Sequence, residues 1–149
     1  TLRGTIRTYD KNVRTKLQDG IRRTAKAVAA MSGAPEPQLK IESGGEAVIN
    51  DVSLVEKTEA VFKTAFGAKA RRIPPIPPSE DFSEFGLAGV PSMFFFVGVY
   101  DPKEVEASRQ PGGKPLPINH SPFYAPVPEP SIKTAQKAMS LAVLNALQR

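Results

Sequence analysis

The chain has 149 residues, of which 40% are hydrophobic and 23% are charged, a composition typical of a globular protein rather than a disordered one. It contains no cysteine, which excludes a disulfide framework and a thiolate metal site within these residues. The net charge of +5 is unevenly placed, because residues 1–33 carry eight Lys or Arg and two acids, whereas the remainder is −1. This asymmetry predicts two units of different origin.

Targeting and membrane signals are absent from the sequence. No apolar run approaches the ~18–20 residues that a helix needs to cross a bilayer, so we expect no membrane partner. No signal peptide is visible, but strand-like sequence begins directly at Thr1. We therefore expect that the chain starts inside a fold, and its compartment stays open between cytoplasm and periplasm.

The first part of the chain is predicted to form a strand–helix–strand unit. Polar and apolar residues alternate over residues 2–9, which is typical of a half-buried strand. Asp10 is a candidate N-cap for a helix whose apolar residues recur at helical spacing until Gly33. A second alternation over residues 38–43 predicts the other strand.

A second unit is predicted from residue 46 onward. Asn50 or Asp51 caps a helix that ends at Gly67, and residues 92–100 form an apolar run typical of a strand covered on both faces. A long loop rich in Pro and Gly, residues 101–128, leads to a last helix that begins at Pro130.

The predicted elements do not complete a layer in either unit. A doubly covered strand needs neighbouring strands, and the second unit offers at most one more short strand. One strand–helix–strand piece cannot close a sheet layer either. Both units are therefore interpreted as halves, and we expect the missing halves to precede Thr1.

His120 is the only histidine, and it lies in the loop before the last helix. Imidazole can bind a metal ion or transfer protons near neutral pH, and Pro122 restricts the residue before it to extended geometry. A surface loop histidine is the plainer alternative. A metal site needs three or four ligands, and the only other acidic cluster is Glu80 and Asp81, which the dipole of a short helix would also favour.

Two basic features have both a binding and a structural interpretation. Arg7 shares a predicted strand face with Arg3, and it could pair with a substrate carboxylate or simply be solvated. The basic helix over residues 11–26 could contact phosphates, but its basic residues lack the interleaved aromatic residues used for base stacking. We therefore expect no nucleic-acid partner. The absence of a phosphate loop and a nucleophile elbow argues against a self-contained hydrolase.

Six short motifs follow one another along the chain. They are Gly4–Asp10, a basic amphipathic helix, Val48–Asp51, Ser79–Ser83, Pro91–Gly98 and His120–Phe123. Their order resembles the C-terminal part of the aminoacylase/carboxypeptidase family of di-metal amidohydrolases, which includes hippurate hydrolase and the indole-acetyl-amino-acid hydrolases. The resemblance implies an α/β fold. Residues 1–45 would be the second half of a ferredoxin-like lid that makes a homodimer contact, and residues 46–149 the C-terminal segment of an α/β zinc-peptidase domain.

The resemblance also implies a function for the intact parent, which would hydrolyse the amide bond of an N-acyl amino acid or a small peptide with two divalent, zinc-like ions. His120 matches the last metal ligand of the family. The residues that match substrate-binding positions are Arg7, Asn50, Ser79, Glu80 and Asp81. The general base and the other metal ligands would lie in the missing N-terminal part of the same enzyme, so the fragment alone is expected to be inactive.

The sequence departs from the family pattern before the acidic motif, and two other classes of function stay open. Relatives usually have glycine just before the Glu-Asp-Phe motif, whereas this chain has Pro77-Pro78-Ser79, and proline lacks an amide donor. A basic binding module is one alternative, and nucleic-acid binding that weakens steeply with salt would favour it. The other alternative is a purely structural or dimerising fragment.

Overall fold

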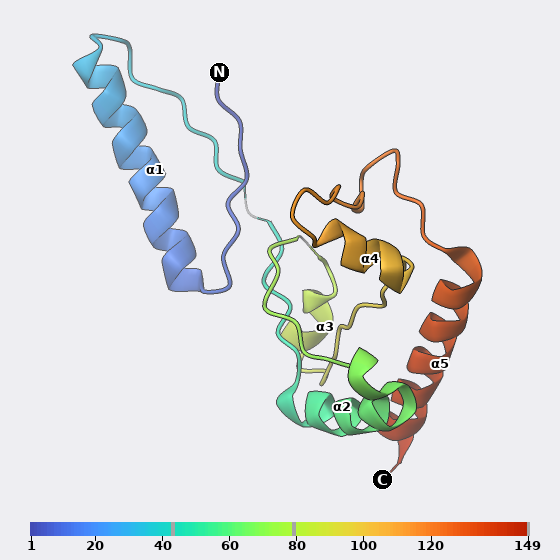
Figure 1. The fold of residues 1–149 in the computed structure, drawn as a ribbon. Coiled ribbons are helices and arrows are strands. Elements are labelled where there is room, and N and C mark those ends of the chain that lie inside the picture. The colour runs from blue at the N-terminus through green and yellow to red at the C-terminus, as the bar shows by residue number, and fades with distance from the viewer. Residues whose placement is uncertain (43, 79, 149) are drawn as a thin grey trace. The chain divides into compact units, whose positions relative to one another are not determined.

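The structure is a computed structural model that describes residues 1–42, 44–78 and 80–148. Its elements in chain order are α1 (Lys11–Met31), α2 (Val52–Phe66), the 3-10 turn η1 (Gly67–Lys69), α3 (Ser83–Leu87), α4 (Pro102–Ser108) and α5 (Pro128–Leu147) (Figure 1). The chain forms two compact units, one of residues 1–51 and 72–94 and the other of residues 52–71 and 95–149. The predicted boundary of the parent enzyme, between a lid half of residues 1–45 and a catalytic segment of residues 46–149, stays a prediction.

The first predicted helix is confirmed as α1, together with its start and stop signals. The Asp10 carboxylate accepts a hydrogen bond from the amide of Val13 at 2.9 Å, which satisfies one donor of the first turn. At the other end, the Ser32 amide donates to the carbonyl of Val28 at 3.1 Å, and Gly33 has φ 63°. Glycine adopts this left-handed conformation without steric cost, so the helix ends there.

The predicted α/β class, with a strand–helix–strand lid half and a buried strand, is wrong. Every regular element among the described residues is helical, and residues 1–8, 34–42 and 91–99 form no strand. A strand exists only where a neighbouring segment completes a ladder of backbone hydrogen bonds, and alternation of side chains does not supply that neighbour. Phe96 is 55% exposed, so residues 92–100 are not covered on both faces either.

The second unit is centred on the packing of α2 against α5. Thr58 on α2 and Ala138 on α5 are 1% and 4% exposed, and the Asn145 amide donates to the Thr58 hydroxyl at 3.4 Å. Phe62 of α2 meets the ring of Phe95 edge to face, with centroids 5.2 Å apart. These contacts make α2, α5 and the segment after residue 94 one packed unit.

The long loop predicted over residues 101–128 contains a helix that the sequence analysis missed. Asp101 caps α4 by accepting from the amide of Lys103 at 2.8 Å, and Pro102 occupies the first turn. An Asp followed by Pro is an ordinary helix start, but the many Pro and Gly residues around it favoured a loop. The last helix, α5, starts at Pro128 rather than at the predicted Pro130.

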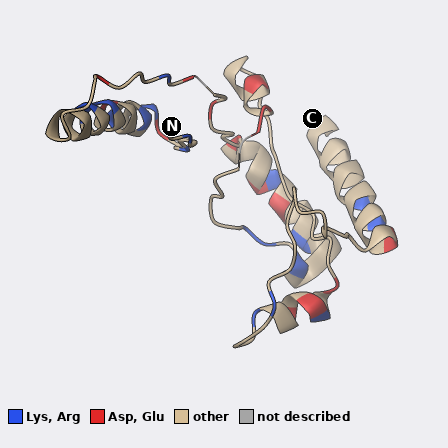
Figure 2. Cartoon of the chain, turned by 90° about the horizontal axis from the view of Figure 1, so that it is seen from above, with Lys and Arg blue, Asp and Glu red and all other residues tan. Residues whose placement is uncertain are grey.

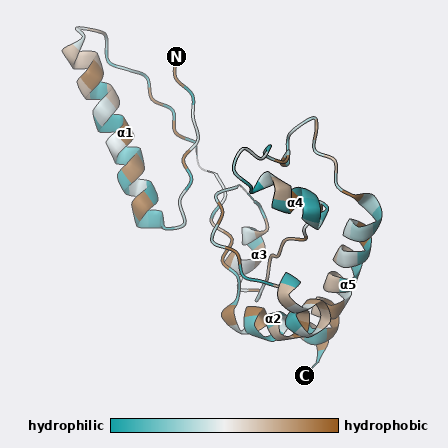
Figure 3. Ribbon diagram, in the orientation of Figure 1, coloured by the Kyte–Doolittle hydropathy of each residue, from teal (hydrophilic) through white to brown (hydrophobic). Residues whose placement is uncertain are grey.

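Apolar side chains remain widely exposed in both units. Ala138 is the one buried hydrophobic residue among those described, and α1 contains no buried residue over its whole length. Hydrophobic residues lie along α1 in Figure 3, interrupted by hydrophilic ones. Exposed apolar surface on this scale is typical of sites that other polypeptide covers. None of the described helices has both the length and the apolar character to cross a bilayer.

Candidate functional site

His120 lies on an exposed turn just before α5, in the second unit. The Ser121 amide donates to the carbonyl of Ile118 at 3.0 Å, and the Tyr124 amide donates to the carbonyl of Ser121 at 3.1 Å. His120 has φ 72°, the left-handed conformation that few residues other than glycine adopt. The turn of residues 118–121 therefore contains His120 in this unusual conformation, a second turn follows directly, and the His120 side chain is exposed.

The residues present do not fit a metal ion by themselves. Within residues 1–42, 44–78 and 80–148, no cluster of three or more His, Cys, Asp or Glu could hold one. A protein zinc site takes at least three protein ligands. The role of His120 as a metal ligand therefore stays a prediction that requires ligands beyond those described.

Asn50 joins two segments of the first unit that are far apart in sequence. Its amide nitrogen donates to the carbonyl of Phe94 at 2.9 Å, and its amide oxygen accepts from the amide of Phe94 at 2.8 Å. The Asp51 amide adds a bond to the carbonyl of Ser92 at 2.8 Å. The side chain of Asn50 thus pairs with the Phe94 backbone as a neighbouring strand would, and its proposed contact with substrate stays a prediction.

The acidic motif forms an exposed turn before α3. The Glu80 carboxylate accepts from the amides of Asp81 and Phe82 at 3.0 and 3.3 Å. Both acids precede the helix rather than lying in its first turn, because α3 begins at Ser83. Ser79 falls outside the described residues. The Glu80 carboxylate therefore orients its own turn, and this leaves the Asp81 side chain exposed to solvent.

Phe94 brings the Asn50 segment and the acidic turn together. The Phe94 ring packs against Phe82, with centroids 5.4 Å apart, while its backbone pairs with Asn50. A Cβ atom on Gly45 would lie 3.4 Å from the carbonyl of Glu80, so this segment also approaches the turn closely. The structure thus places Asn50 and the turn at Glu80 in one cluster of the first unit. Arg7 lies in the same unit, and its contact with this cluster stays a prediction.

Ser83 and Arg14 are two residues of this unit that the sequence analysis did not single out. Ser83 is 4% exposed, and its hydroxyl has no hydrogen-bond partner among the described residues. Arg14 on α1 donates to the Thr8 hydroxyl, the Glu46 carboxylate and the Gly45 carbonyl, each at 3.3 Å. Neither position has a sequence signal that separates it from an ordinary helical Ser or a solvated Arg.

Comparison with known proteins agrees with the resemblance at a coarse level. No family model matches the chain. Over 103 residues it is 28% identical to thermostable carboxypeptidase 2 and 27% identical to thermostable carboxypeptidase 1, both of Saccharolobus solfataricus. The similarity covers 69% of this chain and a quarter of the length of each carboxypeptidase. The chain is therefore distantly similar to peptidases, and it matches only a minor part of them.

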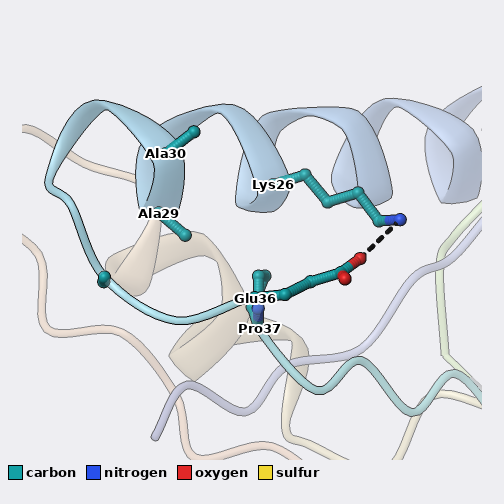
Figure 4. A pocket seen from close by; sticks show the side chains of 6 residues that line it. Lys26, Ala29, Ala30, Glu36 and Pro37 are labelled. Atoms are coloured by element: carbon teal, nitrogen blue, oxygen red, sulfur yellow. Dashed lines mark ion pairs between the residues drawn. The ribbon is translucent and has the colours of Figure 1, made fainter.

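One titratable group in the first unit is clearly perturbed. Lys26 of α1 lies 2.7 Å from the carboxylate of Glu36, beside a shallow pocket of about 310 Å³ that Ala29, Ala30 and Pro37 also line (Figure 4). The hydrogen bond from Lys26, reinforced by its charge, holds the pKa of Glu36 below the usual 4.5. This is a solvent-exposed ion pair between α1 and the segment that follows it, and exposed pairs of this kind contribute little to stability.

Proposed function

We propose that this chain is the C-terminal part of a metal-dependent amidohydrolase or peptidase, which cleaves the amide bond of N-acyl amino acids or small peptides. The observation that carries the proposal is the similarity of 103 residues to two carboxypeptidases. The order of the six motifs along the chain supports it. The aminoacylase type of substrate rests on those motifs, whereas the hydrolase class rests on the carboxypeptidases as well.

His120 is the residue of this chain that we assign to the metal. Its imidazole is exposed and its backbone has φ 72°. A non-glycine residue in this conformation costs about 1–3 kcal/mol, and such residues cluster at functional sites. When bound, the ions would polarise the scissile carbonyl and activate water. The other ligands would come from polypeptide outside the described residues, so no catalytic step is assigned to this chain.

We assign five residues to the substrate side of the site: Arg7, Asn50, Ser79, Glu80 and Asp81. A guanidinium suits the terminal carboxylate of an N-acyl amino acid, because its planar donors match the two oxygens. The pairing of Asn50 with Phe94 would hold its segment against the acidic turn. In this proposal Asn50 positions the cleft wall more than it contacts substrate.

Hydrolysis assays on two polypeptides test the proposal. The complete product of the gene and the 149-residue chain alone are each incubated with N-acetyl and N-benzoyl amino acids and with dipeptides. We expect turnover by the complete product, its loss on adding a chelator, and no turnover by the chain alone. His120→Ala should abolish activity, whereas Asn119→Ala, one residue away on the same exposed turn, should retain it.

Two results would count against the proposal. Full activity in the presence of chelator would contradict the proposed metal dependence. Equal loss of activity in the Asn119→Ala and His120→Ala variants would show that the turn matters only as structure. Hydrolysis by the purified 149-residue chain would overturn the assignment of the catalytic base and other ligands to missing polypeptide.

A further inference from the structure

An exposed segment without regular structure, residues 71–78, connects η1 to the acidic turn. Its sequence is Arg-Arg-Ile-Pro-Pro-Ile-Pro-Pro, and every residue in it is exposed, including Ile73 at 48% and Ile76 at 38%. Residues 73–78 make no hydrogen bond with any other described residue. The proposed hydrolase function gives this segment no role, so its composition and exposure need another explanation.

Covalent geometry holds the backbone of this segment in the extended conformation of a polyproline II helix. Proline fixes its own φ at about −65°, and it restricts the residue before it to extended ψ values. Four residues of the segment stand directly before a proline: Ile73, Pro74, Ile76 and Pro77. The conformation that polyproline grooves bind is therefore formed in advance, which lowers the conformational entropy lost on binding.

The prolines also limit how the rest of the enzyme could cover the segment. Only Ile73 and Ile76 among residues 73–78 keep a backbone N–H, so neither a central strand nor a helix interior can include the run. Burial inside a fold would leave the carbonyl groups of the run in need of hydrogen-bond donors. In a polyproline helix these carbonyls are hydrated. The segment is therefore suited to the surface of the complete enzyme, unlike the apolar face of α1, which needs cover.

The spacing of residues in the segment indicates the kind of partner. Two prolines three residues apart occur twice in the chain, both times in this segment, and nowhere else among its 15 prolines. An arginine precedes each pair by three residues. A polyproline helix has about three residues per turn, so this spacing places the arginine and both prolines of a set along one edge. The two overlapping sets are Arg71, Pro74 and Pro77, and Arg72, Pro75 and Pro78.

We propose that residues 71–78 dock into a protein domain that binds polyproline helices in an aromatic-lined groove with carboxylates at one end. The proline rings pack between the aromatic side chains, and the arginine pairs with the carboxylates, which sets the direction of binding. Basic residues also lie along α1 (Figure 2), but α1 contains no proline. The inference does not depend on the hydrolase function, because it requires neither metal nor substrate.

Titration of an SH3 domain that binds Arg-x-x-Pro-x-x-Pro peptides tests the proposal, because its groove has this chemistry. NMR follows the groove resonances of the isotope-labelled domain as the 149-residue chain, or the complete gene product, is added. We expect both to bind, and salt to weaken the binding. Pro74→Ala combined with Pro75→Ala removes one proline from each set, with its ring contacts and its preformed backbone. This variant should bind at least about tenfold more weakly, a free-energy change of about 1.4 kcal/mol.

Pro35→Ala combined with Pro115→Ala is the matched control, because both prolines are exposed and lie outside the two sets. It should bind like the unchanged protein. The Pro74 and Pro75 substitutions fall where residues 73–78 make no hydrogen bond with the described residues, so the fold should persist, which circular dichroism checks. An SH3 domain whose groove tryptophan is replaced by lysine should not bind.

Four results would overturn the proposal. They are absence of binding, unchanged binding by the Pro74→Ala and Pro75→Ala variant, equal weakening by the control variant, and equal binding to the SH3 domain with the altered groove, which would show attraction by charge alone. Binding by the 149-residue chain but not by the complete gene product would also overturn it, because the rest of the enzyme would then cover the segment.

Discussion

Replacing Asn50 by alanine tests how the first unit is held together. The substitution removes both hydrogen bonds between the Asn50 side chain and the backbone of Phe94, which measure 2.9 and 2.8 Å. A hydrogen bond contributes about 1 kcal/mol net, so we expect a loss of about 2 kcal/mol of local stability. Because about 1.4 kcal/mol corresponds to tenfold, the amide of Phe94 should exchange with solvent roughly 30-fold faster.

Hydrogen exchange followed by NMR is the appropriate assay, because it reports the opening of single amides and does not require global two-state unfolding. Asn12→Ala is the matched control, since Asn12 is exposed on α1 and makes no side-chain hydrogen bond with the described residues. Its effect should stay within about 0.5 kcal/mol. If Phe94 exchanged at the same rate in Asn50→Ala as in the unchanged protein, the pairing would not hold the two segments together, and the cluster with the acidic turn would lose its basis.

Three further substitutions in the first unit have expected outcomes. Ser83→Ala should be neutral or stabilise by up to about 1 kcal/mol in urea unfolding, because it removes a buried hydroxyl that has no hydrogen-bond partner among the described residues. A clear loss of stability would show that the hydroxyl is hydrogen-bonded. The pKa of Glu36 is lower in the folded state than in the unfolded state. The stabilisation by its ion pair with Lys26 is therefore present at pH values above the unfolded-state pKa, and it is lost as the pH falls through the folded-state pKa. The pKa of Glu36, measured as the midpoint of an NMR titration, should therefore be higher in Lys26→Met. An unchanged midpoint would contradict the assignment of the lowered pKa to Lys26. Arg14→Lys keeps the charge near Glu46 but loses the forked contacts to Thr8 and Gly45, so amides at residues 44–46 should exchange faster, whereas Arg22→Lys should leave them unchanged.

The helices could be predicted because their signals are local. Asp10 and Gly33 bound α1, and Gly67, with φ 59°, follows the last residue of α2, as the sequence indicates. The predicted strands were wrong, because an alternating segment becomes a strand only beside a hydrogen-bonding neighbour, and none forms among the described residues. α4 was missed since its Asp-Pro start lies within a stretch whose Pro and Gly content is typical of loops.

The candidate site was predictable only in part. The position of His120 before the last helix is confirmed, but its left-handed backbone conformation has no sequence signal. The pairing of Asn50 with Phe94 joins residues 44 positions apart, which periodicity and capping rules cannot anticipate. Burial of the Ser83 hydroxyl likewise depends on packing that forms only in the folded unit.

The metal content of the complete gene product, purified without chelator, tests the account most directly. Mass spectrometry of the native protein should find divalent metal in the unchanged protein, and less metal in His120→Ala than in Asn119→Ala. A complete product that binds no divalent metal, or one whose content is the same in both variants, would contradict the assignment of this chain to a metal-dependent hydrolase through His120.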